Sequence, residues 1–269
     1  MRKSLLILVG LMSLAYWSCN DEPEMPEAPL ELLAEDAQAL ELISNYFDTY
    51  AEDYPVPWTY ADSTTWREIK LDTITDEESG TRYLTVGSIT LYLTSPDKYI
   101  QYHIHMFKNL KELKVYGCAG SMFSSDNVPR GLERLLIDRL DPEEPGYIMI
   151  PKQKFDVSSR VCTFKEVTIH GTDMKYVDFF ARLDGYFDLS HNLIEDKVST
   201  NMTRFFNPFN LSHNKYKVME NGWSFWKTEN NIPNLQYNEL EIPQDIIESD
   251  FWKKHSEKFI GNPGYVAPQ

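Results

Sequence analysis

The sequence predicts an α/β repeat solenoid, in which short parallel strands stack side by side and helices close both ends. Eight segments follow the pattern apolar-x-x-apolar-x-apolar, with Asp184 in the first apolar place of one of them, and the last apolar position falls at 71, 91, 115, 137, 169, 189, 211 and 237. The intervals between these positions run from 20 to 32 residues, and all but one lie between 20 and 26. Self-similarity at such a period is the signature of a repeat architecture, because each unit buries its apolar side against its neighbours.

A second observation is the residue three positions after the last apolar one, where the chain turns out of the strand. Cys118, Asn192 and Asn214 stand at this offset, whereas Leu140 and Leu240 depart from it. The stretches FDLSHN and FNLSHN, which end at Asn192 and Asn214, are nearly identical. A β-sandwich of short strands is the alternative, but this duplication favours repeats.

These features resemble leucine-rich repeat proteins, specifically irregular lipoprotein members from bacteria. The resemblance covers roughly residues 66–242, with about eight repeats. It implies a short parallel sheet on the concave side of a curved stack, and binding rather than catalysis. Cys118 at the Asn/Cys position of its repeat is expected to be a buried, inert thiol, and whether it pairs with Cys162 stays open.

The apolar ends of a repeat stack need caps. Apolar residues at helical spacing predict an N-terminal helical cap within residues 30–65: Leu33, Ala37, Leu40, Ile43, Phe47 and Tyr50. Pro243 and Asp245 open a second candidate helix, whose apolar face carries Ile247, Phe251 and Phe259. The sequence therefore predicts a C-terminal cap over residues 243–269.

Residues 1–18 have the layout of a bacterial export signal. Arg2 and Lys3 precede the apolar run Leu5–Ala15, which is too short for a permanent membrane span. Small Ser18 stands before Cys19, and this resembles a lipoprotein signal peptide whose cysteine becomes the lipid-anchored first residue. The alternative is an ordinary cleaved signal with an incidental cysteine.

The segment that follows, residues 19–29, is acidic and contains proline, which predicts a tether. It resembles the tags that send some Gram-negative lipoproteins to the cell surface, so we expect an outer-membrane, lipid-anchored and surface-exposed protein. The whole chain has 26 basic and 41 acidic side chains, and none of the basic ones lies between Cys19 and Trp66. This charge excludes a nucleic-acid-binding stripe.

The sequence contains no phosphate-binding loop, nucleophile elbow or metal-type cysteine pair, so we expect no catalytic residues, no cofactor and no metal. His191 and His213 occupy equivalent repeat positions and should stack close together. A polar role at the strand exit is the favoured interpretation of this pair.

The positive hypothesis concerns the residues between and just after the inward apolar positions, which would line the concave sheet. The expected partner-binding set is Lys70, Asp72, Thr90, Tyr92, Lys114, Tyr116, Asp138, His170 and Asp188. Tyrosine offers a large rigid surface and a hydroxyl, which suits recognition. The sequence thus predicts a protein partner. Polysaccharide is the runner-up, through the two tyrosines or through Trp223, Phe225 and Trp226.

Overall fold

The computed structural model describes residues 29–49, 58–93, 101–117, 129, 131–138, 155–156, 163–172, 177–178, 182–195, 197–200 and 209–268. The chain divides into two compact units, Met1–Glu31 and Leu32–Gln269. The predicted export signal, Cys19 and nearly all of the tether lie outside the described residues, as do Cys118 and Cys162. The architecture below is that of the second unit.

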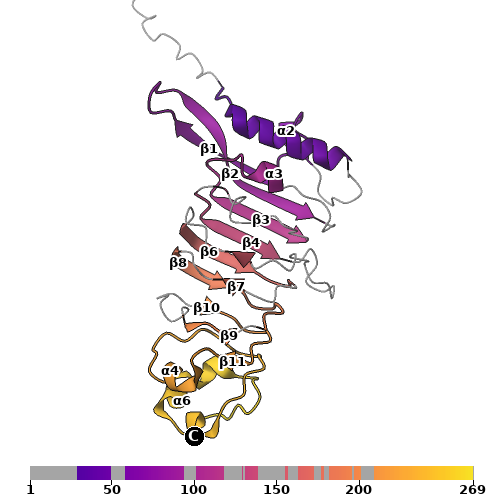
Figure 1. The fold of residues 1–269 in the computed structure, drawn as a ribbon. Coiled ribbons are helices and arrows are strands. Elements are labelled where there is room, and N and C mark those ends of the chain that lie inside the picture. The colour runs from indigo at the N-terminus through magenta and orange to yellow at the C-terminus, as the bar shows by residue number, and fades with distance from the viewer. Residues whose placement is uncertain are drawn as a thin grey trace, which may run out of the picture. The chain divides into compact units, whose positions relative to one another are not determined.

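The second unit is an α/β structure built on a mostly parallel seven-stranded sheet (Figure 1). The strands are neighbours in chain order: β1 (Ile69–Thr75), β2 (Arg82–Leu93), β3 (Glu112–Gly117), β4 (Arg134–Asp138), β6 (Thr163–Ile169), β8 (Arg182–Asp188) and β10 (Phe209–Asn210). Two small parallel sheets join β5 (Phe155–Asp156) to β7 (Val177–Asp178) and β9 (Lys197–Val198) to β11 (Val218–Met219). The sequential order follows from crossover connections between parallel neighbours.

The core forms where equivalent apolar positions of successive strands lie in register. Two such rows are fully buried: Ile89, Leu113, Leu135, Val167 and Phe187 in one, and Leu91, Val115, Ile137, Ile169 and Leu189 in the other. Side chains alternate along a strand, so the residues between them point to the opposite face. The predicted inward residues of these strands are confirmed.

Strand β1 corrects the first predicted repeat. It runs antiparallel to β2, with a register shift between Lys70 and Leu71. Leu71 was expected to point inward but is 37% exposed. The cause is the short connection 76–81, where Asp76 Oδ1 accepts the Ser79 N–H at 2.7 Å and Gly80 adopts a φ of 68°. A tight turn of this kind joins antiparallel strands, whereas a parallel pair requires a long crossover.

The predicted N-terminal helix is present as α2 (Ala34–Thr49), at the β1–β2 end of the sheet (Figure 1). Leu40 and Ile43 are fully buried. Asp36 is buried as well, and its Oδ2 accepts the Thr85 hydroxyl at 2.6 Å and the Val86 N–H at 2.7 Å. Burial raises the pKa of Asp36, although these two hydrogen bonds favour the carboxylate. The carboxyl group therefore ties the helix to β2. A short helix, α3 (Gln101–Ile104), lies beside α2, and a 3-10 turn spans Ser63–Thr65.

The C-terminal segment forms several short helices in place of one long one. These are α4 (Gly222–Trp226), α5 (Gln244–Ile247), α6 (Asp250–His255) and a 3-10 turn at Ser256–Phe259. Helix α5 ends at Ile247, and Ser249 caps α6 by accepting the Trp252 N–H. Apolar side chains from these elements, Ile246, Phe251, Trp252 and Phe259, are buried. Among the described residues, no helix is long and apolar enough to cross a membrane.

Four buried asparagines recur in the C-terminal half of the unit: Asn192, Asn214, Asn238 and Asn262. Asn214 shows the shared pattern, with Nδ2 within 2.8–3.2 Å of the carbonyl oxygens of Leu189, Leu211 and Ser212. Its Oδ1 accepts the Ile194 N–H at 3.1 Å. The other three also take up backbone groups of the preceding turn. We call this set the asparagine row.

The asparagine row corrects the last predicted repeat by two residues. Leu235, and not Tyr237, is the residue equivalent to Leu211, because Asn210 bridges to Asn234 in parallel. Asn238 then falls three positions later, in the row, and is 5% exposed. The row ends at Asn262, inside the segment predicted as the C-terminal cap.

Candidate binding face of the sheet

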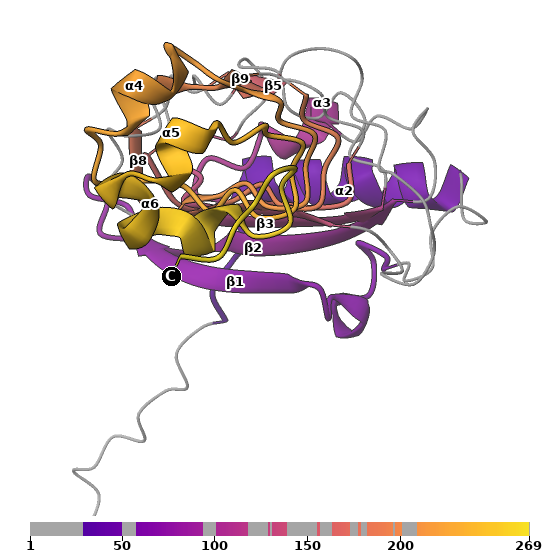
Figure 2. The ribbon, with the colours of Figure 1, turned by 90° about the horizontal axis from the view of Figure 1, so that it is seen from below.

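The face of the seven-stranded sheet opposite to the buried rows carries three rows of mostly polar side chains, and we call it the polar face. The first row is Ser88, Glu112, Arg134, Glu166 and Tyr186; the second is Thr90, Lys114, Leu136, Thr168, Asp188, Asn210 and Asn234; the third is Tyr92, Tyr116, Asp138 and, just past β6, His170. Figure 2 shows α3, β5 and β9 together on one side of β2 and β3. The core lies on that side, and among the described elements no helix covers the polar face there.

Tyr92 and Tyr116 form a stacked pair at the ends of β2 and β3. They are directly in register, their ring centroids lie 5.3 Å apart and their planes differ by 16°. Both side chains are half-buried. Burial, with contributions from Glu68 and Tyr116, raises the pKa of Tyr92. The structure thus unites two predicted residues into one continuous aromatic surface.

Charged groups lie beside the tyrosine pair. Lys114 Nζ is 3.4 Å from Glu112 Oε1, and the Ser88 hydroxyl donates to Glu112 Oε2 at 2.8 Å. Burial opposes ionisation of Glu112, but these two partners outweigh it and lower the pKa of the carboxyl. Thr90 is the in-register neighbour of Lys114. On the other side, Asp138 follows Tyr116 in the third row. The pair is therefore flanked by one cation and one anion.

Lys70 and Asp72 do not lie where the sequence placed them. Because β1 is antiparallel, Lys70 pairs with Ser88 and so joins the first row, while Asp72 pairs with Thr85. The Asp72 carboxylate lies 3.6 Å from Lys111 Nζ. The Asp72 carboxylate also covers Gly87, since a Cβ added at Gly87 would lie 2.3 Å from Asp72 Oδ2. The prediction that Asp72 shares a row with Tyr92 is wrong.

The three remaining predicted residues meet in one cluster. His170 lies between two carboxylates, with Nδ1 3.7 Å from Asp138 Oδ2 and Nε2 3.1 Å from Asp188 Oδ1. The Nε2 atom is buried and meets Asp188 as an ion pair, outside hydrogen-bond alignment. Burial alone would lower the pKa of His170, but the two carboxylates outweigh it and raise the pKa to about 9. His170 is therefore a cation at neutral pH.

Asp188 is the centre of this cluster. Its carboxylate accepts the Tyr186 hydroxyl at 2.8 Å, the Asn210 amide at 3.0 Å and the Ser190 N–H at 2.9 Å. Burial opposes ionisation, yet His170 and these donors hold the pKa of Asp188 well below its usual range. Burial and the neighbouring Asp188 raise the pKa of Tyr186 to about 12. Both carboxylate oxygens of Asp188 are engaged internally, which makes the cluster a fixed polar network.

The predicted stacking of His191 and His213 is confirmed. Their ring centroids lie 4.2 Å apart, and Tyr237 extends the column at 4.4 Å from His213. All three residues adopt φ values of 54–58°, in the left-handed region that marks the turn out of each strand. Among the described residues, no group of three or more His, Cys, Asp or Glu side chains is placed to hold a metal ion.

The alternative aromatic cluster does not form an open platform. Trp226 is 0% exposed and its Nε1 donates to the Glu220 carbonyl at 2.9 Å. Trp223 packs against Phe259, and Phe225 meets Trp226 edge-on. These rings belong to the C-terminal core, so a sugar ring cannot stack on Trp226.

Sequence reasoning missed Tyr186, Asn234 and Lys258, which lie at the C-terminal end of the polar face. Asn234 continues the row of Asp188 and Asn210. Lys258 comes next in this row, because the Lys258 carbonyl accepts the Leu235 N–H. The signal was present as Leu-x-x-Asn at 189, 211 and 235 and as Phe-x-x-Asn at 259. No family model, no curated protein and no solved structure matches this chain.

Proposed function

We propose that the chain is a leucine-rich repeat module, lipid-anchored through Cys19 in the outer membrane and exposed at the cell surface, which binds a protein partner without catalysis. Support for the repeat assignment comes from parallel strands in chain order and from the asparagine row, whose members recur every 22 to 24 residues. The export signal and acidic tether support the location.

The observation that carries the binding proposal is the stacked Tyr92–Tyr116 pair on the polar face, which no described helix covers at β2 and β3. Two rings held by neighbouring strands present a rigid apolar surface whose ordering is already complete before a partner arrives. Lys114 and Asp138 flank the rings. Aromatic residues at the centre with charged groups around them are typical of protein interfaces.

Binding fits the remaining polar groups better than catalysis does. The carboxylate of Asp188 is filled by His170 and by three hydrogen-bond donors. A general base needs a lone pair that can reach a substrate proton, and this carboxylate has its acceptors occupied. The network is therefore proposed to hold the strands and to shape the face.

The test compares two variants of the full chain. An extracellular protein mixture is passed over immobilised wild type, Tyr92→Ala/Tyr116→Ala, and Tyr237→Ala as a control at an exposed tyrosine outside the three rows. We expect wild type and control to retain the same protein, and the double variant to bind it roughly 100-fold more weakly. Loss of the stack itself should cost only about 1 kcal/mol of stability.

Equal retention by the double variant would remove the tyrosine pair from the site. Enzymatic deglycosylation distinguishes the protein partner from the polysaccharide alternative. The retained protein is deglycosylated and then tested for binding again. Binding that survives deglycosylation supports the protein partner, whereas its loss supports a glycan on Tyr92 and Tyr116.

A further inference from the structure

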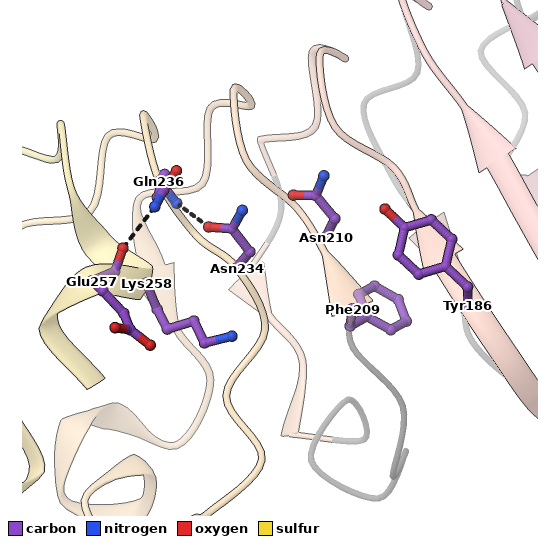
Figure 3. A pocket seen from close by; sticks show the side chains of 7 residues that line it. All are labelled: Tyr186, Phe209, Asn210, Asn234, Gln236, Glu257 and Lys258. Carbon is purple, nitrogen blue, oxygen red and sulfur yellow. Dashed lines mark hydrogen bonds between the residues drawn. The ribbon is translucent and has the colours of Figure 1, made fainter. Parts of the chain in front are cut away.

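The polar face ends in an open pocket of about 500 Å³, beside the C-terminal helical segment (Figure 3). Tyr186 from β8 and Asn210 from β10 line one side. Asn234 and Gln236 line the middle, and Glu257 and Lys258 line the other side. Its volume lies within the range of about 300–1,000 Å³ that is usual for small-ligand sites.

The Tyr186 ring is an exposed but fixed surface of this pocket. Its side chain is 41% exposed, and its hydroxyl is tied to Asp188 at 2.8 Å. Asp188 is held in turn by Asn210 and His170. The hydroxyl orients the ring before a ligand arrives, so the side chain loses little freedom on binding. The apolar face of the ring stays available.

The middle of the pocket offers a donor and an acceptor that are already oriented. Asn234 Oδ1 accepts the Gln236 N–H at 3.2 Å, and Gln236 Nε2 donates to the Glu257 carbonyl at 2.8 Å (Figure 3). In the part of the chain that the structure describes, Asn234 Nδ2 and Gln236 Oε1 have no further hydrogen-bond partner. Each amide is therefore held at one end and open at the other.

The charges of the pocket balance. Glu257 and Lys258 carry opposite signs, and within the described ranges neither side chain forms a salt bridge or a side-chain hydrogen bond. The negative charge of Asp188 is matched by His170. A phosphate or carboxylate ligand would thus find no excess of positive charge, whereas an uncharged ligand would meet donors and acceptors in equal measure.

We propose that this pocket binds a neutral saccharide. The face of a sugar ring is apolar and suits the Tyr186 ring, while each hydroxyl both donates and accepts and suits Asn234, Gln236, Glu257 and Lys258. The pocket shares no residue with the Tyr92–Tyr116 pair, so this site goes beyond the proposed protein binding and does not depend on it.

The experiment measures binding of short neutral hexose oligomers to the full chain by calorimetry, with uronic acid oligomers as the charged comparison. We expect wild type to bind a neutral oligomer and Tyr186→Ala to lose about tenfold or more in affinity. Lys258→Met should also weaken binding, and it removes no salt bridge or side-chain hydrogen bond within the described residues. Tyr237→Ala is the matched control, because Tyr237 is 49% exposed and lies outside the pocket.

The Tyr92→Ala/Tyr116→Ala variant should keep saccharide binding, which separates this site from the proposed protein site. Absence of binding to every neutral oligomer by the folded wild type would overturn the proposal. So would binding that both Tyr186→Ala and Lys258→Met leave unchanged, or a preference for uronic acid oligomers. If Tyr186→Ala lowers the melting temperature, Lys258→Met decides the outcome.

Discussion

The two ends of the sheet are stabilised in different ways. At the C-terminal end the same device recurs, with Asn192, Asn214, Asn238 and Asn262 each binding backbone groups of two successive turns. At the N-terminal end the chain uses contacts that occur once: an antiparallel hairpin and the buried Asp36 that joins α2 to β2. The C-terminal turns thus repeat one kind of contact, whereas the N-terminal end relies on contacts that are each made once.

This difference extends to the polar face. The C-terminal rows are rich in amides, such as Asn210 and Asn234, whereas the N-terminal rows carry Lys114 and the stacked Tyr92–Tyr116 pair. The amides of the C-terminal rows offer hydrogen-bonding groups, while the rings of β2 and β3 present an apolar surface. We therefore place the two proposed sites at opposite ends of the same face.

The largest expected effect is on the asparagine row. Asn214→Ala leaves buried backbone groups of Leu189, Leu211 and Ile194 without their side-chain partner, and should lower the free energy of unfolding by about 3 kcal/mol. The matched control is Asn109→Ala at the N-terminal end, which loses one bond to the Thr85 hydroxyl and should cost about 1 kcal/mol. Urea unfolding of both variants measures the difference, and equal losses would remove the distinction between the ends.

A smaller, more local loss is expected for Asp36→Ala. The Val86 N–H and Thr85 hydroxyl lose their acceptor, which should cost about 2 kcal/mol. Because this contact belongs to the N-terminal end, hydrogen exchange should speed up in α2 and β2 and stay unchanged at Leu235 and Asn262. Uniform acceleration along the sheet would show that the two ends unfold as one.

The His170 network should make stability depend on pH. The pKa of His170 is raised from 6.5 to about 9 in the folded protein, so its contribution is fully present below pH 6.5 and is lost as pH rises through about 9. Thermal melts across this interval should show a decline that His170→Gln abolishes. A decline of the same size in the variant would assign the titration to another group.

The smallest expected effect on stability comes from Tyr92→Phe/Tyr116→Phe. The rings and their stacking at 5.3 Å are retained, so the free energy of unfolding should change by less than about 0.5 kcal/mol. Partner binding should still weaken by about tenfold, because the hydroxyls are lost from the interface. Unchanged affinity would mean that the pair contributes only apolar surface.

Inward residues such as Leu113 and Val167 could be predicted because burial imposes the same apolar spacing on every parallel strand. The same spacing at Ile69 and Leu71 was misleading, since an antiparallel edge strand also places apolar residues at intervals of two. The turn-forming Asp76–Gly80 segment is the local feature that distinguishes the two cases. The direction of a strand thus depends on its connection more than on its own residues.

The tyrosine pair was accessible to sequence reasoning because both rings occupy one repeat position. The contact of His170 with Asp188 was not accessible in this way. The two residues are 18 positions apart in the chain and meet only across neighbouring strands. Tyr186 was missed for another reason: it stands two residues before Asp188, in a row that the repeat alignment left unused. Pockets made from several rows are therefore harder to predict than single columns.

Photo-crosslinking on intact cells tests most directly whether the Tyr92–Tyr116 pair contacts a protein partner at the cell surface. The cells express the full chain with Cys19 unchanged. A photoreactive phenylalanine analogue replaces Tyr116 in one variant and the exposed Thr73 of β1 in another. We expect a crosslinked protein from position 116 only, and we expect protease added outside the cells to remove that crosslinked protein. No crosslink from position 116, or an equal one from position 73, would contradict the proposal.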